Sequence, residues 1–534
     1  MPRHRPENEM TADCASEGGL SKTDIARAAL LFAAALALRI PFRSQLAYQW
    51  DSAQFALAVG EYDIRISQPH APGFYGYVML GRLVNWFVGE PHQALVWLSV
   101  IAGAWLVAMG YLLATSMFGR WSGWGTGLIL LTSPLCWFHS DIALTNIVDS
   151  ALVVSFVFAG WRAIQRGVTW RQTIAMAVLL AGVGSVRQQS AVLLIPLVAY
   201  VFLGFARPRG WKLLCAVVLA AGFSLFWFVP VTRSAGGVAS YMELLHLKSR
   251  YDAPRTVWGG GGVGALLTDI SCMGRACWVG LLIAAIIPLA EFIHGVVFEE
   301  RTAKDSFYRA NKTQLNVLGL WITPMVLFGF FLYVALPGHV LNFFPAIAVL
   351  ASLGLSSFAE RLATSPTVKK AQVHWAVLTI MVAVNAVVFV YSPRSVRRLL
   401  LDVRMTGVEI RQHDAESSAC FQMIRKNWPS GNVVVCHYLE DFFWGFRQFQ
   451  YHLPEYQNVL LNADASLPGD LGVKKWVGYQ RQTTFQSKIS IPDGYEVILV
   501  VPPGQSLDFF KSCFDVRKAV LVMESGAKLY KLQP

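Results

Sequence analysis

Long apolar stretches dominate the first 390 residues of this chain and constrain its fold more than any other feature. An α-helix needs about 20 mostly apolar residues to cross the hydrocarbon core of a bilayer. The whole sequence is 54% hydrophobic and only 15% charged, whereas soluble globular domains carry about 25% charged residues. We therefore predict a polytopic α-helical membrane protein with about eleven transmembrane helices, which excludes a soluble enzyme, a disordered scaffold and a nucleic-acid-binding protein. The predicted spans are 24–41, 94–117, 124–139, 149–165, 172–187, 190–206, 211–231, 277–298, 314–336, 338–359 and 374–391.

The basic residues predict how these helices are oriented. Lys and Arg outnumber Asp and Glu by 45 to 33, which gives a net charge of +12, and cytoplasmic loops carry the excess of Lys and Arg in membrane proteins. The N-terminal segment 1–23 has no cleavable signal pattern, so we expect it to be cytoplasmic and the first span to be retained. An odd number of spans in the membrane domain 24–391 then places the C-terminal portion outside a plasma or inner membrane. The basic residues fall in alternate short connections, near 120, 162–171, 207–212, 301–312 and 361–370.

Three segments lie outside the membrane in this topology: 42–92, 232–276 and the tail 392–534. The tail differs from the rest because it holds short β-branched runs bounded by turn residues, and two stretches of helical character. We therefore predict a small extracytoplasmic α/β domain there. The predicted strands are Val433–Cys436, Val497–Val501 and Ala519–Met523, and the predicted helices are 414–427 and 506–514.

The loop 232–276 and the cysteines each leave alternatives open. The run Gly259–Gly262 is either part of a mobile strap that closes over a substrate or part of a disordered connector. Eight cysteines are too few for a disulfide scaffold. In an oxidising exterior the possible pairs are Cys272 with Cys277, or two of Cys420, Cys436 and Cys513.

The first external loop carries the densest set of reactive side chains. Asp51 opens an amphipathic helical run, and Glu61 and Asp63 follow that run. The stretch 68–73 contains two prolines and predicts a rigid corner. After the corner, 74–88 is apolar but interrupted by polar residues, which predicts a helix that lies in the membrane interface.

Acids at this boundary suit proton transfer. A carboxylate there can take a proton from an acceptor hydroxyl or amide while that group attacks a lipid-linked electrophile. Asp51 is the main candidate for this role, and Glu61 and Asp63 are supporting candidates. The alternative for Asp51 is a helix N-cap, and the alternative for the other two is a solvated loop acid.

Further candidates lie near the outer ends of the spans. Asp141 and Asp149 flank the third and fourth spans, where an acid is costly unless it is hydrated, paired or functional, and N-capping is the alternative. Arg187 ends the fifth span, and its planar guanidinium suits phosphate oxygens, although an interfacial arginine also snorkels to lipid headgroups. Gln188 follows Arg187, and His339 lies in the turn before the tenth span.

The first loop resembles the GT-C class of membrane glycosyltransferases, and within it the branch related to protein O-mannosyltransferases. That branch has an Asp-Ser-Gly/Ala-Glu opening followed by His-Pro-Pro-Gly-Tyr. The opening is matched by Asp51-Ser52-Ala53, with Gln54 in place of Glu, and the corner is matched in part. The likeness is specific over about 45 residues and general over the first 390. The corner residues that it brings into the site are His70, Pro72, Gly73 and Tyr75.

The resemblance implies a GT-C fold, a polyprenyl-phosphate-linked sugar as donor, and Asp51 as the base that activates the acceptor. It also implies a second acid, either Asp141 or Asp149, at the helix after the second external loop. Glu61 and Asp63 fit the loose Glu-x-Asp pattern of the class only as a second choice. Arg187, Gln188 and His339 are the candidates for the donor phosphate, and His339 stands where the class has arginine.

We therefore expect an inverting hexosyl- or pentosyltransferase that acts on the external face, with a protein, lipid or glycan as acceptor and no nucleic-acid partner. No zinc-type spacing and no P-loop appear in the sequence, so no metal ligand is assigned and a need for a divalent metal stays open. One alternative is a transporter or flippase of a lipid-linked sugar, although no internal repeat supports it. The other is a membrane scaffold that displays the tail as a binding module.

Overall fold

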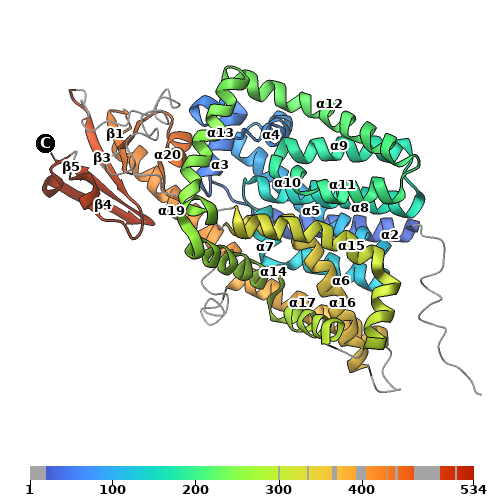
Figure 1. Ribbon diagram of the computed structural model, residues 1–534. Helices are drawn as coiled ribbons and strands as arrows, with labels where there is room; N and C mark the ends of the chain where they lie inside the picture. Colours follow the sequence, from blue (N-terminus) through green and yellow to red (C-terminus); the bar gives the residue numbers. More distant parts are fainter. Residues whose placement is uncertain are drawn as a thin grey trace, which may run out of the picture.

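The computed structural model describes residues 20–298, 301–332, 336–363, 370–392, 405–429, 431–438, 443–461, 493–511 and 514–533. The helical part comprises α2 (Lys22–Arg39), η1 (Ile40–Phe42), α3 (Trp50–Gly60), η2 (Ile64–Ile66), α4 (Tyr75–Val88), α5 (Pro91–Phe118), α6 (Arg120–Thr132), α7 (Pro134–Ser140), α8 (Thr145–Arg166), α9 (Trp170–Val186), α10 (Gln188–Leu193), α11 (Ile195–Phe205), α12 (Arg209–Ala235), α13 (Val238–Asp252), η3 (Ala253–Arg255), η4 (Val257–Gly261), α14 (Gly262–Phe298), α15 (Arg301–Phe331), η5 (Pro337–Asn342), α16 (Phe344–Leu362) and α17 (Lys370–Tyr391). The C-terminal part comprises α19 (Gly407–Asn427), β1 (Val433–Tyr438), α20 (Phe446–His452), β2 (Gln457–Leu461), β3 (Glu496–Val501), η6 (Leu507–Phe510), η7 (Val516–Lys518), β4 (Ala519–Ser525) and β5 (Ala527–Leu532). Figure 1 shows a helical bundle with this small sheet domain at one end, beside α3 and α13.

The predicted architecture of a polytopic helical membrane protein with a small α/β domain is confirmed. Among the described residues, eight helices are long and apolar enough to cross a membrane. The predicted N-terminal segment 1–23 lies mostly outside the described residues. The eight helices are Lys22–Phe42, Pro91–Phe118, Thr145–Arg166, Gln188–Phe205, Arg209–Ala235, Val257–Leu282, Phe307–Phe331 and Lys370–Tyr391.

Two of the predicted spans are divided into shorter helices. The span 124–139 becomes α6 and α7, because Ser133 caps α7 through the backbone N–H of Cys136 and Pro134 occupies the first helical position. The span 190–206 becomes α10 and α11, with Pro196 at the start of the second helix. A serine cap at the first break and a proline at each break therefore divide stretches that hydropathy alone predicts as continuous.

The segment 232–276 is mostly helical, which differs from the predicted loop. It holds the end of α12, all of α13 and the beginning of α14, a helix that is kinked at Leu282. The glycine run forms the tight connection between α13 and α14, where Gly260 and Gly262 have φ angles of +127° and +53°. Only glycine adopts such angles at little cost, so the run makes a turn rather than a long strap.

The predicted disulfide between Cys272 and Cys277 is wrong, since both are free thiols on α14. Five residues along a helix rotate a side chain by about 140° around the axis, so the two sulfur atoms point to different faces. Cys420 is also a free thiol. Of the other two candidates, Cys436 is buried in β1, and Cys513 lies outside the described residues.

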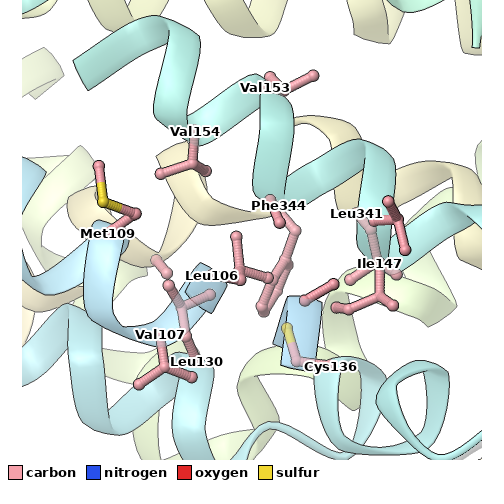
Figure 2. Packing of buried hydrophobic residues seen from close by; sticks show 14 of the residues in the cluster. Leu106, Val107, Met109, Leu130, Cys136, Ile147, Val153, Val154, Leu341 and Phe344 are labelled. Carbon is pink, nitrogen blue, oxygen red and sulfur yellow. The ribbon is translucent and has the colours of Figure 1, made fainter. Parts of the chain in front are cut away.

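A continuous apolar core joins α5, α6, α7, α8, η5 and α16. Ser150 reinforces this packing, because its hydroxyl donates a hydrogen bond of 2.7 Å to the carbonyl of Leu341 and so ties α8 to η5. The core sets the relative position of the two segments that carry Asp149 and His339. Figure 2 shows the packing of Leu106, Val107, Met109, Leu130, Cys136, Ile147, Val153, Val154, Leu341 and Phe344.

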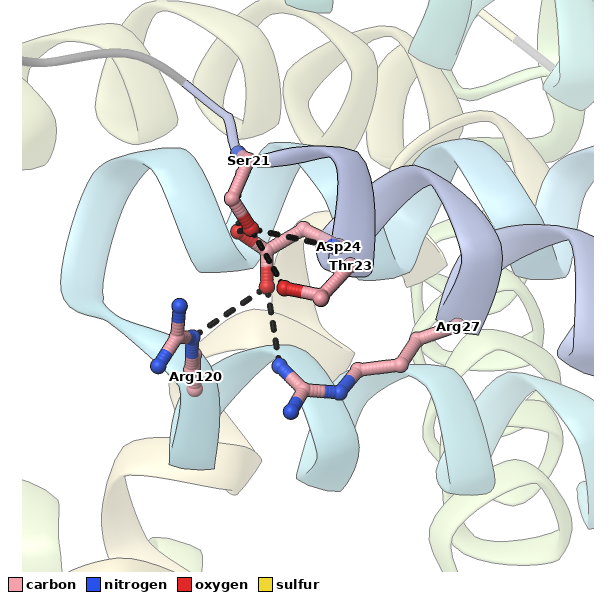
Figure 3. Close-up of polar contacts among 5 residues, drawn as sticks. All are labelled: Ser21, Thr23, Asp24, Arg27 and Arg120. Carbon is pink, nitrogen blue, oxygen red and sulfur yellow. Dashed lines mark hydrogen bonds and ion pairs between the residues drawn. The ribbon is translucent and has the colours of Figure 1, made fainter.

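Polar contacts tie the start of α2 to the start of α6. Ser21 and Asp24 form a capping box at the N-terminus of α2. Asp24 also accepts hydrogen bonds from Arg27 at 3.0 Å and from Arg120 at 3.2 Å, as Figure 3 shows. One carboxylate thus caps a helix and joins two helices at the end of the bundle opposite the sheet domain.

Helix α4 matches the predicted helix at 74–88. Its outer side chains include Trp86 and Phe87, which are 82% and 80% exposed. Exposed aromatic rings on an amphipathic helix are typical of the membrane–water interface.

The C-terminal domain contains a mixed five-stranded sheet in the order β2-β1-β3-β5-β4. Strand β1 runs parallel to β2 and β3, whereas β5 runs antiparallel to β3 and β4. The three predicted strands and the helix at 414–427 are confirmed, and β2 and β5 are additional. The predicted helix at 506–514 is reduced to the single turn η6 among the described residues.

Candidate active site

Asp51 lies in the first turn of α3, close to solvent. The N-cap of this helix is Gln49, and no side chain caps it, so the N-cap alternative for Asp51 is wrong. The Asp51 side chain is 30% exposed. Its negative charge suits the positive end of the helix dipole, and its oxygens are accessible to a substrate.

His70 in the corner faces Asp51. Its Nδ1 lies 3.6 Å from the nearer carboxylate oxygen of Asp51 and donates a hydrogen bond of 2.6 Å to the side-chain oxygen of Gln54. Burial lowers the pKa of His70 to about 4, while the Asp51 carboxylate acts in the opposite direction. The His70 ring is therefore neutral near pH 7. It lies beside the Asp51 carboxylate as a neutral hydrogen-bonding group and not as a cation.

The backbone of the corner requires glycine at position 73. Gly73 has a φ of +104°, and a Cβ there would come within 2.7 Å of the Tyr62 hydroxyl. That hydroxyl donates a hydrogen bond of 2.8 Å to the Gly73 carbonyl. Tyr75 packs edge-to-face on Tyr62 with ring centroids 5.4 Å apart, so it contributes packing to the corner.

The corner is tied to two other elements through one carbonyl. The Pro72 oxygen accepts hydrogen bonds from the Gln188 side chain at 3.4 Å and from the Tyr241 hydroxyl at 3.1 Å. Gln188 begins α10 and Tyr241 lies on α13. The segment 232–276, for which the sequence allowed either a mobile strap or a disordered connector, thus contains a helix, α13, that packs directly on the first loop.

The other two first-loop acids have different surroundings. Glu61 ends α3 and is exposed. Asp63 is buried, caps η2 and forms a paired contact with Arg65, with oxygen–nitrogen distances of 2.7 and 3.0 Å. The Asp63 carboxylate is therefore engaged by a local partner, in contrast to Asp51.

Arg187 is buried where α9 meets α10, with 6% of its surface exposed. Its Nε donates a hydrogen bond of 3.0 Å to the Thr145 hydroxyl, and its Nη2 lies 3.1 Å from Nε2 of His339. Burial and the Arg187 charge keep the pKa of His339 well below its usual range, so His339 accepts this hydrogen bond as a neutral ring. The remaining nitrogen, Nη1, has no hydrogen-bond partner among the described residues.

Asp149 lies inside α8, where the Arg187 charge acts on its buried carboxyl group. It lies one turn into the helix, whose N-cap is Leu144, so Asp149 does not cap it. Its carboxylate accepts a hydrogen bond of 2.7 Å from Ser190, which in turn accepts one of 2.9 Å from Asn342. The Arg187 charge acts favourably on this carboxylate.

Asp141 belongs to a different cluster. It follows α7 and is fully buried, and the positive charge of Arg39 on α2 acts on its carboxyl group. Its backbone carbonyl accepts a hydrogen bond of 2.7 Å from Ser44. Asp141 therefore stabilises the junction of the first helix with the bundle, and Asp149 is the acid beside Arg187.

A pocket opens beside Arg187 between η5, α14 and α15. The polar part of its wall includes Arg187, Gln189, Asp269, His339 and Asn342. The rest of the wall is mostly apolar. The apolar side chains are Leu193, Met273, Met325, Phe328, Leu336, Val340 and Phe343.

The two polar clusters are neighbours. The Arg187 charge acts on the His70 ring, and the next residue, Gln188, contacts the corner itself. Lys248 on α13 also acts on His70 and forms an ion pair of 3.1 Å with Asp252. Within the described ranges, no group of three His, Cys, Asp or Glu side chains is arranged to hold a metal ion.

Several residues of the site were given no role by the sequence reasoning. Gln54 lies three residues after Asp51 on the same helix, and that spacing is a local signal that both share a face. Ser190 and Asn342 gave no such signal, because each meets its partners in the site through distant segments, and Lys248 reaches His70 only because α13 packs on the first loop.

No family model matches this sequence, and no curated protein matches it. Among solved structures, ArnT from Cupriavidus metallidurans is similar, both bound to undecaprenyl phosphate and in the apo state, with a TM-score of 0.53 and 13% sequence identity over 96% of this chain and 97% of ArnT. The Archaeoglobus fulgidus oligosaccharyltransferase matches with a TM-score of 0.44 and 13% identity over 82% of this chain and 62% of that one. The chain therefore shares the fold of ArnT.

Proposed function

We propose that this protein is a glycosyltransferase that moves a sugar from a polyprenyl-phosphate donor to an acceptor on the external face of the membrane. The observation that carries the proposal is the buried Arg187, which lines a largely apolar pocket close to the Asp51–His70 corner and whose Nη1 has no hydrogen-bond partner among the described residues. The similar ArnT was solved with undecaprenyl phosphate bound, which supports a lipid of this class.

The donor phosphate would bind at the polar wall of the pocket. Arg187 offers the free nitrogen as a charge-assisted donor, and Gln188 and His339 complete the polar surroundings. The polyprenyl chain would lie along the apolar wall between α14 and α15. A dry, mostly buried cation interacts more strongly with phosphate than an exposed one, because water screens it less.

Asp51 would act as the general base. It takes a proton from the acceptor hydroxyl or amide as that group forms a bond to the anomeric carbon. The bond between that carbon and the phosphate oxygen breaks, and polyprenyl phosphate leaves with the electron pair. Arg187 stabilises the negative charge on the leaving group, and a single displacement inverts the anomeric configuration.

His70 and Gln54 would keep the base in position. The neutral His70 ring is fixed by its hydrogen bond to Gln54 and lies next to Asp51. The acceptor is a protein, a lipid or a glycan, and the first-loop motif favours the branch related to protein O-mannosyltransferases. The alternative is a transporter or flippase of a lipid-linked sugar.

The direct test is transfer by the purified protein in proteoliposomes, with undecaprenyl phosphate sugars as donors. We expect Asp51→Asn to lower kcat by about 10²–10⁴-fold, the usual contribution of a general base, with an unchanged melting temperature. Glu61→Gln is the matched control because it removes an exposed acid from the same loop, and it should keep wild-type turnover.

Near-normal turnover of Asp51→Asn would contradict the assignment of the base. A wild-type protein that scrambles the lipid-linked sugar across the bilayer without transferring it would favour the flippase instead. The anomeric configuration of the product, measured by NMR, tests the predicted inversion.

A further inference from the structure

The C-terminal domain binds the first loop immediately before α3. Three successive backbone amides of the loop donate to its side chains. Gln45 and Leu46 donate to the two carboxylate oxygens of Asp414, at 2.8 and 3.1 Å. Ala47 donates to Nε2 of His452 at 3.0 Å. Because hydrogen bonds to a carboxylate are strong and directional, this contact fixes the backbone that enters the helix.

The same domain binds the loop again after α3. Arg447 is 1% exposed, and its Nη2 donates a hydrogen bond of 2.7 Å to the carbonyl of Ile66. Between these two contacts, Trp50 at the start of α3 packs in one buried cluster with Phe446 and Leu460. The domain thus contacts the segment 45–66 at its beginning, at the first turn of α3 and at its end.

Asp51 lies in the first turn of the helix that these contacts enclose. Loops lose conformational freedom when their backbone groups are bound, and they open locally when such bonds are removed. General-base catalysis is sensitive to small displacements, since a shift of about 1 Å can cost about 100-fold in rate.

We propose that the C-terminal domain positions the catalytic base by binding the first loop on both sides of α3. Asp414, His452 and Arg447 are the positioning residues, and they act through the loop backbone without touching the substrate. This inference rests on the proposed function for its catalytic consequence. The structural part, the restraint of the segment 45–66, stands on the hydrogen bonds alone.

The test uses the full-length protein in lipid nanodiscs with the variants Asp414→Asn and Arg447→Lys. Each keeps the size of the side chain but loses part of its hydrogen bonding to the loop. Asp508→Asn is the matched control, because it makes the same change on an exposed carboxylate of the same domain that pairs with Lys511.

Hydrogen exchange provides a readout that is independent of catalysis. We expect amide exchange in residues 45–60 to become about tenfold faster in both variants and to stay at the wild-type rate in the control. Unchanged exchange in this segment would overturn the proposal, whether or not the protein is a glycosyltransferase. Uniformly faster exchange over the whole chain would also overturn it, because general destabilisation would then explain the effect.

The kinetic readout separates positioning from general stability. We expect kcat for sugar transfer to fall about 10–100-fold, with the donor KM and the retention of undecaprenyl phosphate unchanged, since Arg187 is not affected. Faster amide exchange in residues 45–60 together with a wild-type kcat would overturn the positioning role. If wild-type protein transfers no sugar, the proposed function fails, while the exchange result still decides whether the domain restrains the loop.

Discussion

The first-loop corner and the Arg187 cluster lie next to each other but differ in how their polar groups are used. In the corner, Asp51 is 30% exposed and has no capping role, and His70 is oriented by Gln54. Arg187, in contrast, is buried among α8, α9 and η5 and keeps one nitrogen without a partner in the described part of the chain. The Asp51 carboxylate is accessible to solvent, whereas the Arg187 guanidinium is buried.

This difference matches the two tasks of the proposed reaction. A base must meet an acceptor that arrives from water, so it has to remain accessible. A group that stabilises a leaving phosphate is more effective in a dry, pre-organised environment, where charges are less screened. The contrast also separates Asp51 from Asp63, which is already engaged by Arg65.

The largest expected effect comes from removing the buried charge. Arg187→Gln should lower kcat/KM by about 10²–10³-fold, the usual loss when one donor to a developing negative charge is removed. Retention of undecaprenyl phosphate, measured by native mass spectrometry, should fall as well. Arg187→Lys keeps the charge but loses the planar guanidinium, so we expect its kcat/KM to lie between those of the wild type and Arg187→Gln. Arg233→Gln, which removes an exposed arginine of α12, serves as the control; equal losses in both would disprove a specific role.

A smaller effect is expected at His70, and it depends on pH. Burial lowers its pKa to about 4 from the ordinary 6.5, so below pH 6.5 the unfolded chain takes up a proton that the folded protein refuses. This residue therefore makes the wild type less stable as the pH falls from 6.5 towards 4. His70→Gln should lower kcat by about tenfold through poorer orientation of the base.

The melting temperature of His70→Gln should also fall less on acidification than that of the wild type. Scanning fluorimetry at about pH 7 and about pH 5 checks this. An identical pH dependence in both proteins would show that the ring is not buried and neutral in the fold.

The smallest effect on catalysis is expected at Asp63, where the comparison with Asp51 is sharpest. Asp63→Asn weakens a contact with the half-exposed Arg65 and should lower stability by about 1 kcal/mol, seen as a lower melting temperature. Turnover should stay within about twofold of the wild type, the reverse of the pattern for Asp51→Asn. A loss of turnover at full stability would instead place Asp63 in the reaction.

Much of this protein was predictable from local sequence patterns. Apolar stretches of sufficient length predicted the membrane bundle, and short β-branched runs bounded by turn residues predicted three strands of the sheet, because both signals lie within a short window. The position of Asp51 at the start of a helix and the rigid corner around Gly73 are likewise local. The alternative role of Asp51 as a helix N-cap is wrong, because the helix begins one residue earlier, at Trp50.

The remaining features were decided by tertiary structure. Arg187 meets His339 across 152 positions, and Gln188 meets Pro72 across 116. Asp414 meets the first loop across 369 positions. Apolar burial drives the helices together without direction, so the local pattern predicts that helices form but not which polar groups become neighbours. The sequence by itself therefore determined the membrane fold class and the candidate base. Only the packed tertiary structure decided that Arg187 lies near the corner that contains Asp51, and that the C-terminal domain binds the first loop.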